Sequence, residues 1–499
     1  MCAAYIAIDL GAESGRVIVG VLADGRLRLE EVHRFVHEPV WLPTGLHWDT
    51  TGIWREIVAG LRRAAEWAKA SGSELVSVGV DTWGVDWALV DEAGELAGLP
   101  HAYRDPRNAA AYEKVIAKLG KERIYQTTGI QFMPLNTLYS LYAHKLADAR
   151  GLASADRLLF MPDLFHFWLS GSRTTEATIA STSQMVHCHT GEWARDMLGE
   201  LGLPTKLLGP ITPPGSVVGT LRPKLADETG LPVGLRVVAP AAHDTASAVA
   251  AVPAAEGTQW CYLSSGTWSL LGAEIDSPCV TPEAESASFT NEGGVAGTIR
   301  FLKNIAGLWL VQECRRDLAR RGQEFDYAAL MRLAAEAAAF RTLVDPAHGP
   351  FQTPGDMLHK IDDFARSTRQ PKPESPGQYV RACLESLALA YRDKLELLEK
   401  ILRRRFDVLH VVGGGGKNEL LCQMTADATG CRTVVGPYEA TAIGNALVQA
   451  MALGHVRDLA ELRGIVARSY QPMTYQPASD AGWDDAYHKF LGAITVKPA

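Results

Sequence analysis

The chain has 499 residues, of which 47% are hydrophobic and 21% charged, a balance typical of a soluble globular protein with room for about two to four domains. The formal net charge of -8 gives no general attraction to nucleic acid or to an anionic membrane. It does not exclude a phosphate ligand, because the backbone N–H groups of a glycine-rich loop bind phosphate without a basic patch.

The sequence shows no sign of export or of a membrane anchor. Its longest apolar runs are far shorter than the roughly 20 residues of a membrane-spanning helix. Met1 leads into a strand-like segment rather than into a basic stretch followed by an apolar one. The eight cysteines lack C-x-x-C or zinc-like spacing, which predicts unpaired core or surface thiols. We therefore expect a cytoplasmic protein.

Two segments repeat one pattern: an apolar strand, a small glycine-containing turn and a second strand. They are residues 5–20 and residues 260–272. Both are predicted β-hairpins whose turns can bring backbone N–H groups close to an anion. Either one alone could be an ordinary hairpin, but their recurrence half a chain apart favours two homologous halves.

Between the two hairpins, strands alternate with turns and helices. Residues 75–80 and 87–90 are predicted strands, and residues 91–94 form a turn after the second of them. A further short strand over residues 236–240 leads into a predicted helix that starts near His243. Such alternation indicates the α/β class with largely parallel or mixed sheets.

The second half continues the alternation. Residues 379–405 carry apolar side chains at the helical period of about 3.6 residues, which predicts an amphipathic helix with three arginines at its C-terminal end. Residues 408–412 are a predicted buried strand that enters a run of four glycines. Residues 366–377, rich in proline and charge, are predicted to be an exposed loop.

The turn of the first hairpin carries a carboxylate and small residues. Asp9 ends the first strand directly before a glycine turn, a place that suits water-mediated Mg²⁺ binding beside a phosphate. Ser14 adds a hydroxyl, Gly15 a close approach of the backbone, and Arg16 a positive charge. A plain surface turn is the alternative interpretation.

A second carboxylate stands at the junction of a strand and a helix, in the segment His243-Asp244-Thr245. A carboxylate near a helix N-terminus stays ionised, as a general base must. In phosphoryl transfer such an Asp accepts the proton of the attacking hydroxyl. An Asp that caps the helix is the more common use of such a residue, so the motif alone does not decide between the two.

Two further motifs could contact small molecules. Asp81 and Trp83, in Asp81-Thr-Trp-Gly-Val-Asp86, fit a sugar, with the indole against C–H groups and the carboxylate on hydroxyls. A packed Trp with capping carboxylates explains them equally well. The glycines of residues 413–416 could pass under the base and ribose of a nucleotide, although the run matches neither the dinucleotide-binding nor the P-loop pattern. A bare turn is the alternative there.

In their order along the chain these motifs resemble the FGGY carbohydrate kinases of the actin, hexokinase and Hsp70 superfamily. The resemblance covers residues 4–455 and is carried by Asp9-Leu-Gly, Asp81-Thr-Trp-Gly-Val-Asp, His243-Asp-Thr-Ala-Ser, Ser264-Ser-Gly-Thr-Trp and Gly413-Gly-Gly-Gly. It implies an α/β fold of two actin-like (ribonuclease H-like) domains with an active-site cleft between them. The implied ranges are a mainly sugar-binding domain over 1–245, a mainly ATP-binding domain over 246–460, and an extension over 461–499.

The resemblance also implies roles for individual residues. Asp244 would accept the sugar's proton, and Asp9 would bind Mg²⁺ through water. Glu13 departs from the small hydroxyl residue common in this family's turn, which puts its own contact in doubt. The implied ATP-binding residues are Ala12, Glu13, Ser14, Gly15, Arg16, Thr267, Gln312, Gly414 and Gly415. The implied sugar-binding residues are Gly84, His243, Asp244, Thr245 and Asn304.

Some segments, among them 291–294 and 301–312, resemble the rhamnulokinases within this family, which phosphorylate L-rhamnulose at its 1-hydroxyl. The expected ligands are therefore a sugar and ATP with Mg²⁺, and the expected assembly is a monomer or a homodimer. Other ketoses, such as L-fuculose, D-xylulose or L-ribulose, stay open as the substrate. A nucleotide-driven conformational protein of the actin or Hsp70 type, or a silent sugar-binding regulator, would share the hairpins without the base chemistry.

Overall fold

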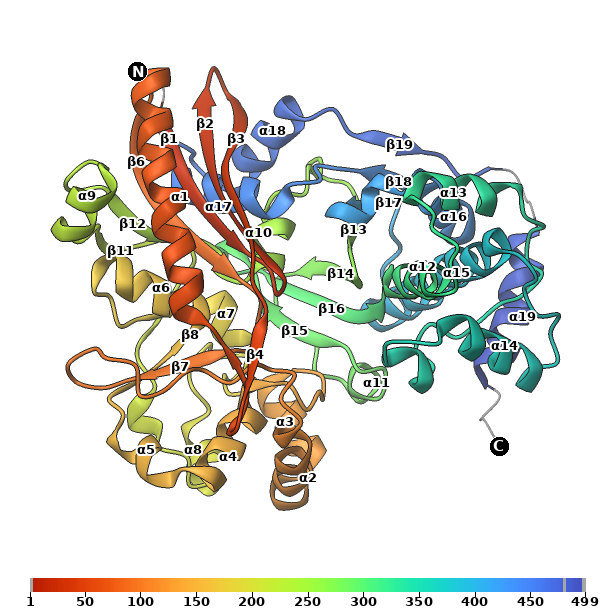
Figure 1. The fold of residues 1–499 in the computed structure, drawn as a ribbon, viewed down its shortest axis with the longest axis horizontal. Helices are drawn as coiled ribbons and strands as arrows, with labels where there is room; N and C mark the ends of the chain where they lie inside the picture. The colour runs from red at the N-terminus through yellow and green to blue at the C-terminus, as the bar shows by residue number, and fades with distance from the viewer. Residues whose placement is uncertain (1–2, 479–481, 496–499) are drawn as a thin grey trace. The chain divides into compact units, whose positions relative to one another are not determined.

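Two main β-sheets organise the chain, one in each of two units of the computed structural model, which describes residues 3–478 and 482–495 (Figure 1). Unit 1 consists of Met1–Ala255, Glu274–Phe301 and Glu439–Tyr470. Unit 2 consists of Glu256–Ala273, Leu302–Tyr438 and Gln471–Ala499. Residues 1–2, 479–481 and 496–499 lie outside the described residues. Compact units need not coincide with sequence domains, so the ranges 1–245, 246–460 and 461–499 stay predictions.

The sheet of unit 1 has six strands in the order β11-β12-β6-β1-β2-β3. Strands β12, β6 and β1 are parallel, and β2 and β3 continue the sheet as antiparallel neighbours. The strands are β1 (Ala3–Leu10), β2 (Ser14–Ala23), β3 (Arg26–Val36), β6 (Glu74–Thr82), β11 (Ser216–Thr220) and β12 (Arg236–Ala239).

Helices α1 (Thr50–Ser71) and α17 (Ala440–Ala452) cover the two faces of this sheet (Figure 1). Gly60 of α1 lies against Val17, whereas Ala446 of α17 lies against Gly20. Successive side chains of a strand point to opposite faces, so residues 17 and 20 of β2 face different helices. Helix α17 thus belongs to unit 1, although most of unit 2 (Leu302–Tyr438) lies between it and the preceding segment of unit 1 in the sequence.

A second core of unit 1 forms around β7 and β8. The remaining strands of unit 1 are β4 (Pro39–Leu42), β5 (Gly45–Trp48), β7 (Trp87–Val90), β8 (Arg157–Phe160), β9 (Thr175–Glu176), β10 (Ile211–Thr212) and β15 (Thr290–Gly293). The helices are α2 (Arg107–Leu119), α3 (Lys121–Thr128), α4 (Thr137–Ala147), α5 (Ala149–Ser154), α6 (Met161–Ser170), α7 (Ala177–Ser181), α8 (Arg195–Glu200), α9 (Pro223–Thr229), α10 (Asp244–Ala250), α11 (Pro282–Ser286) and α18 (Leu459–Ser469).

Unit 2 repeats the strand layout of unit 1. The second main sheet has seven strands in the order β15-β16-β14-β13-β17-β18-β19, in which β13, β17 and β18 are parallel, β14 is antiparallel to β13, and β19 is antiparallel to β18. The strands are β13 (Trp260–Ser265), β14 (Trp268–Ile275), β16 (Ile299–Ala306), β17 (Val408–Val412), β18 (Arg432–Val435) and β19 (Met473–Tyr475). The helices are α12 (Trp309–Arg320), α13 (Tyr327–Glu336), α14 (Met357–Ser367), α15 (Pro376–Leu402), α16 (Glu419–Thr429) and α19 (Trp483–Thr495).

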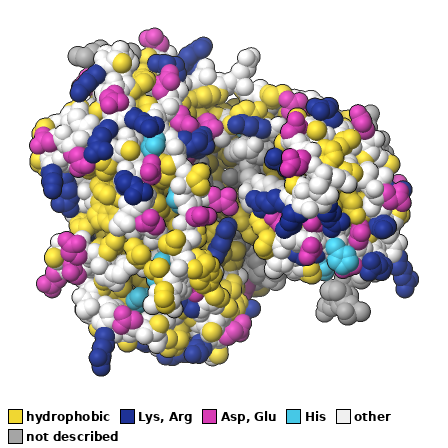
Figure 2. Space-filling model, viewed as in Figure 1, with side chains coloured by type: hydrophobic (Ala, Val, Ile, Leu, Met, Phe, Trp, Pro, Cys, Tyr) yellow, Lys and Arg dark blue, Asp and Glu magenta, His cyan; other side chains and the backbone are white. Residues whose placement is uncertain are grey.

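The predicted α/β class with two sheet-containing domains is confirmed, as are both hairpins, β1–β2 and β13–β14. The strands predicted over 87–90 and 408–412 are β7 and β17. Acidic and basic side chains are interspersed on the face drawn in Figure 2. No helix among the described residues is both long enough and apolar enough to cross a membrane.

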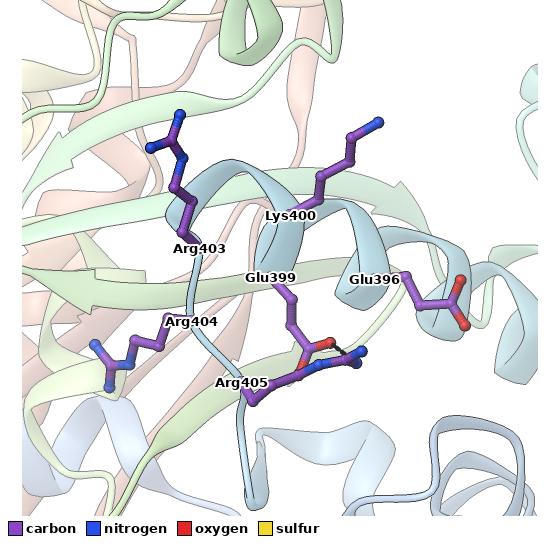
Figure 3. Close-up of a pocket in the computed structure, with 6 residues that line it drawn as sticks. All are labelled: Glu396, Glu399, Lys400, Arg403, Arg404 and Arg405. Carbon is purple, nitrogen blue, oxygen red and sulfur yellow. Dashed lines mark hydrogen bonds and ion pairs between the residues drawn. The ribbon is translucent and has the colours of Figure 1, made fainter.

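The helix predicted over 379–405 is α15, but its predicted C-terminal end is wrong. The helix stops at Leu402 because Arg403 takes a left-handed conformation (φ 50°), and its N–H donates to the Glu399 carbonyl. The three arginines therefore follow the helix and, with Glu396, Glu399 and Lys400, line a hollow at its end (Figure 3). Figure 3 shows their side chains pointing in different directions, and Arg405 pairs with Glu399 at 2.6 Å. The cations do not converge on one ligand.

Candidate active site

Three aspartates predicted from separate motifs gather at one edge of the unit 1 sheet. Asp9 on β1 lies opposite Asp81 on β6, and Thr82 pairs with His243, which directly precedes Asp244. These strands are parallel, so their carboxyl ends meet at the same edge, which is where open α/β sheets bind ligands. The structure thus brings together Asp9, Asp81 and Asp244, residues up to 235 positions apart (244 − 9).

Carboxylates outnumber cations at this edge. The Arg16 guanidinium forms ion pairs with Asp9 and with Glu439. Burial raises the pKa of Asp9; Arg16 opposes this rise, whereas Asp244 and Glu439 add to it. Burial and the nearby charge of Asp9 raise the pKa of Asp81 well above its usual value. A cation bound at this edge would offset both the burial and the mutual repulsion of these carboxyls and would favour their ionised form.

Asp81 is held from behind by helix α17. The amide of Asn445 donates to Asp81 Oδ2 at 2.6 Å, and Gln449, one turn later, donates to Asn445 Oδ1 at 2.6 Å and to the Ile6 carbonyl at 2.9 Å. Asp81 is fully buried, and its Oδ1 has no hydrogen-bond partner in the described part of the chain. Its predicted role as a sugar ligand stays a prediction.

Asp244 has one anchored and one free carboxylate oxygen. Its Oδ1 accepts hydrogen bonds from the Thr245 N–H at 2.5 Å and from the Thr245 hydroxyl at 3.0 Å, and lies 3.4 Å from His243 Nε2. Within residues 3–478 and 482–495 no hydrogen bond reaches Oδ2, and the side chain is 30% exposed. This is the geometry a proton acceptor needs, because the carboxylate is fixed in place while one oxygen stays accessible.

The backbone next to Gly84 is strained. Val85 has a φ of +70°, which is a rare conformation for a β-branched residue. It is held there by a hydrogen bond from its N–H to Thr182 Oγ1 at 3.2 Å and by one from Thr137 Oγ1 to its carbonyl at 2.6 Å. These two hydrogen bonds hold Val85 and, with it, the adjacent Gly84. A Cβ on Gly84 would lie 3.2 Å from His243 Nε2.

Trp83 is almost fully buried, and its ring lies against Trp48. Both indole N–H groups donate to Asp86 Oδ2, Trp48 at 2.6 Å and Trp83 at 2.8 Å. Burial raises the pKa of Asp86 to about 7. Asp86 therefore fixes the Trp83 ring, whose contact with a sugar stays a prediction.

The turn of the first hairpin spans residues 11–13, closed by a hydrogen bond from Gly11 N–H to the Ser14 carbonyl at 2.9 Å. Ala12 and Ser14 are half-buried, and Glu13 is exposed. Gly15 is buried, and a Cβ there would meet the Phe35 ring at 2.3 Å. A side chain at position 15 would therefore have to displace the Phe35 ring and the Leu10 side chain.

In unit 2 the turn of the second hairpin meets the start of helix α12. Gln312 Nε2 donates to Thr267 Oγ1 at 3.3 Å, so the structure brings these two predicted ATP ligands together. The N–H groups of Leu308 and Trp309 donate to the carbonyls of Gly266 and Thr267 at 3.0 and 3.2 Å. Asn304 lies half-buried on β16.

The four glycines that follow β17 serve different purposes. A Cβ on Gly413 would lie 2.9 Å from the Ser265 carbonyl, and one on Gly415 would lie 2.1 Å from Ser265 Oγ. A Cβ on Gly416 would meet Val435 at 2.8 Å. Gly414 is exposed and faces open space. Three of the glycines thus let the loop lie against the sheet, and one is free to face a ligand.

Sequence reasoning missed the residues behind His243. Arg300 and Glu292 form a buried ion pair at 3.0 Å next to the imidazole. Glu292 lies in the segment 291–294, and the sequence motifs predicted a role neither for it nor for Arg300. A charged residue inside an apolar strand was the available signal, because buried charges need partners.

Glu176, a buried carboxyl behind His243, should make stability depend on pH. Its Oε2 accepts hydrogen bonds from Thr178 Oγ1 at 2.6 Å and Ala242 N–H at 3.2 Å, and burial raises its pKa from 4.5 to about 7. A raised folded-state pKa means that this stabilisation is complete below the unfolded value and is lost as the pH rises through about 7. Glu176→Gln should therefore flatten the fall of the free energy of unfolding, measured in urea, between about pH 4.5 and pH 7, by up to about 1.4 kcal/mol per pH unit.

Glu113→Gln, at an exposed position on α2, is the matched control and should leave the pH dependence as it is. Parallel curves for Glu176→Gln and the unaltered protein would show that Glu176 does not titrate in this range.

Comparison with known proteins identifies the family. The model of the FGGY family of carbohydrate kinases, N-terminal domain, matches residues 4–251, and that of the C-terminal domain matches residues 261–453. A rhamnulokinase of Bacteroides thetaiotaomicron is 43% identical over 98% of this chain and 99% of its own length. One of Oceanobacillus iheyensis is 40% identical over 96% of this chain and 99% of its own.

The fold is shared with solved structures of much lower sequence identity. A ligand-bound xylulose kinase from Lactobacillus acidophilus superposes with a TM-score of 0.82 at 15% identity, covering 98% of this chain and 97% of its own. The predicted resemblance and the predicted actin-like two-domain architecture are thereby confirmed. With both family domains matched, and its predicted motifs placed at the edges of two like sheets, the chain belongs to the FGGY family of carbohydrate kinases.

Proposed function

We propose that this protein transfers the γ-phosphate of ATP to the 1-hydroxyl of L-rhamnulose, giving L-rhamnulose 1-phosphate and ADP in rhamnose catabolism. Relatives named rhamnulokinase, about 40% identical over almost the whole chain, support the choice of sugar. The observation that carries the chemistry is Asp244, with one anchored oxygen and one accessible oxygen at the carboxyl edge of a parallel sheet.

In this proposal Asp244 Oδ2 accepts the proton of the 1-hydroxyl as that oxygen attacks the γ-phosphorus. The new O–P bond forms while the bond from phosphorus to the β,γ-bridging oxygen breaks, and ADP leaves with that electron pair. Positioning and electrostatic stabilisation supply most of the rate enhancement in such transfers. The Thr245 N–H and hydroxyl keep Oδ1 fixed, so the basic oxygen holds its direction.

The sugar would lie against Gly84 and His243, where the missing Cβ leaves room beside the imidazole. Thr245 and Asn304 are proposed to complete its contacts, together with the more deeply buried Asp81 and Trp83. The proposed contacts with ATP are the first hairpin turn (Ala12, Glu13, Ser14, Gly15 and Arg16), Thr267 with Gln312, and the loop at Gly414 and Gly415.

The residues at the sheet edge fit a hydrated Mg²⁺ ion. No group of three or more His, Cys, Asp or Glu side chains in the described part of the chain is arranged to hold a metal directly. The excess of carboxylates around Arg16 nevertheless favours a cation that keeps its water shell and takes one or two carboxylates. Asp9 would hold it through water. When bound, Mg²⁺ neutralises charge on the β- and γ-phosphate oxygens.

Purified protein with Mg·ATP should release ADP at least about tenfold faster with L-rhamnulose than with L-fuculose, D-xylulose, L-ribulose or glycerol, because one misplaced hydroxyl leaves polar groups of the site unpaired. ADP release is followed with a coupled assay, and the product is identified by NMR as the 1-phosphate. A higher rate with another ketose would transfer the assignment to that sugar. Sugar-independent ATP hydrolysis alone would favour a conformational protein of the actin or Hsp70 type.

The compartment and the assembly are part of the same proposal: a cytoplasmic enzyme that is a monomer or a homodimer and binds neither nucleic acid nor membrane. Sedimentation of the purified protein decides between the two assembly states.

A further inference from the structure

His243 lies between the proposed base and a buried ion pair. Its Nε2 is 3.4 Å from Asp244 Oδ1, and its Nδ1 is 3.0 Å from Arg300 Nη2 and 3.4 Å from a Glu292 carboxylate oxygen. Arg300 is wholly buried, and its Nε donates to the Gly293 carbonyl at 2.9 Å, which fixes the direction of the guanidinium. All of these residues belong to unit 1.

The chemistry of arginine decides where the imidazole carries its proton. A guanidinium has only donors and keeps its charge in proteins. Nδ1 of His243 must therefore accept the hydrogen bond from Arg300, which leaves the ring neutral with its proton on Nε2. That proton faces Asp244 Oδ1 and the space over Gly84.

Glu292 makes this arrangement depend on Arg300. Burial favours the neutral carboxyl, but the charge of the Arg300 guanidinium opposes burial and lowers the pKa of Glu292, so the carboxylate stays ionised. Without Arg300, an ionised Glu292 would be the nearest partner of Nδ1 and would attract a proton to that nitrogen. The ring would then become an imidazolium or the opposite tautomer.

We propose that Arg300 is a positioning residue that holds His243 in its neutral Nε2–H form, so that Nε2–H donates to Asp244 or to a sugar hydroxyl bound over Gly84. This inference rests on the proposed function of Asp244 as the base. A neutral donor at this place orients the carboxylate through a hydrogen bond. An imidazolium would instead stabilise the ionised carboxylate and make it a weaker base.

The direct test is the ¹⁵N NMR spectrum of the histidine side chains in the full-length protein, recorded with long-range proton correlation. The signals of His243 are assigned by their loss in His243→Gln. The expected pattern is a bare Nδ1 and a protonated Nε2. A protonated Nδ1 in the unaltered protein would overturn the proposal without any activity measurement.

Arg300→Met should move the proton to Nδ1 or add a second one, and should lower kcat about 100-fold while the KM for ATP stays unchanged. Arg300→Lys, which keeps a charged donor, should restore the original tautomer and part of kcat. An unchanged tautomer in Arg300→Met would overturn the proposal, because the residue would then act on structure alone. A changed tautomer with unchanged kcat would overturn it equally.

Removing Arg300 alone leaves a buried, unpaired carboxylate, which destabilises the fold. Arg300→Met combined with Glu292→Gln removes both charges and tests the proposal in a better-balanced protein: kcat should recover above that of Arg300→Met as the pull on the Nδ1 proton disappears. No recovery in a folded double variant would contradict the proposal. The tautomer is measured without substrate, and kcat is measured with whichever sugar gives the highest rate in the ADP-release assay. A wrong assignment of the sugar therefore leaves this test valid.

Discussion

Asp244→Asn is expected to lower kcat for sugar phosphorylation by about 10²- to 10⁴-fold, the usual contribution of a positioned general base. The amide keeps the size of the carboxylate, and its oxygen can still accept the hydrogen bonds of Thr245. It cannot take the proton of the attacking hydroxyl. The KM for the sugar should change little, because the replaced group acts mainly in the transition state. The measurement is initial ADP release over a range of sugar concentrations.

Asp227→Asn on helix α9 makes the same change of charge at an exposed position of unit 1 and should leave kcat unaltered. Calorimetric binding of ATP to Asp244→Asn separates lost chemistry from lost folding. Full turnover by a variant that binds both substrates would remove Asp244 from the mechanism and favour the actin- or Hsp70-like alternative.

Much of the fold could be predicted because its signals are local. A hairpin needs an apolar strand, a glycine-containing turn and a second strand, all within about twenty residues, and both hairpins were found from that pattern. Strand β17 was predicted from a short apolar run that leads into four glycines. The end of helix α15 was misplaced because Arg403 is a good helix former whose left-handed conformation is set by the chain that follows.

The electrostatic environment of the candidate site could not be predicted in the same way. Arg16 pairs with Glu439, 423 positions away, and His243 contacts Arg300, 57 positions away. No local pattern links such residues, since only the folded sheet brings them together. Asp81 is an example. Its motif predicts a sugar ligand, but nothing in that motif predicts its burial or its hydrogen bond with Asn445 of helix α17.

Gly414 and Gly415, the two glycines proposed to contact ATP, should respond differently to the same added methyl group. Gly414→Ala adds a methyl group to open space, so it should leave the urea midpoint unchanged. If the loop passes under the nucleotide, that methyl group should raise the KM for ATP at least about tenfold, as an extra methyl in a close-fitting site does. Gly415→Ala instead puts a methyl group 2.1 Å from Ser265 Oγ and should lower the free energy of unfolding by about 1–3 kcal/mol.

The two variants carry the same added methyl group at adjacent positions, so each is the control for the other. Equilibrium unfolding in urea and steady-state kinetics at saturating sugar give both readouts for both proteins. An unchanged KM for ATP in Gly414→Ala would place the nucleotide elsewhere on unit 2, even if Gly415→Ala behaves as expected. An unchanged midpoint in Gly415→Ala would mean that the loop can move away from Ser265, and the requirement for glycine at this position would then belong to the ligand rather than to the fold.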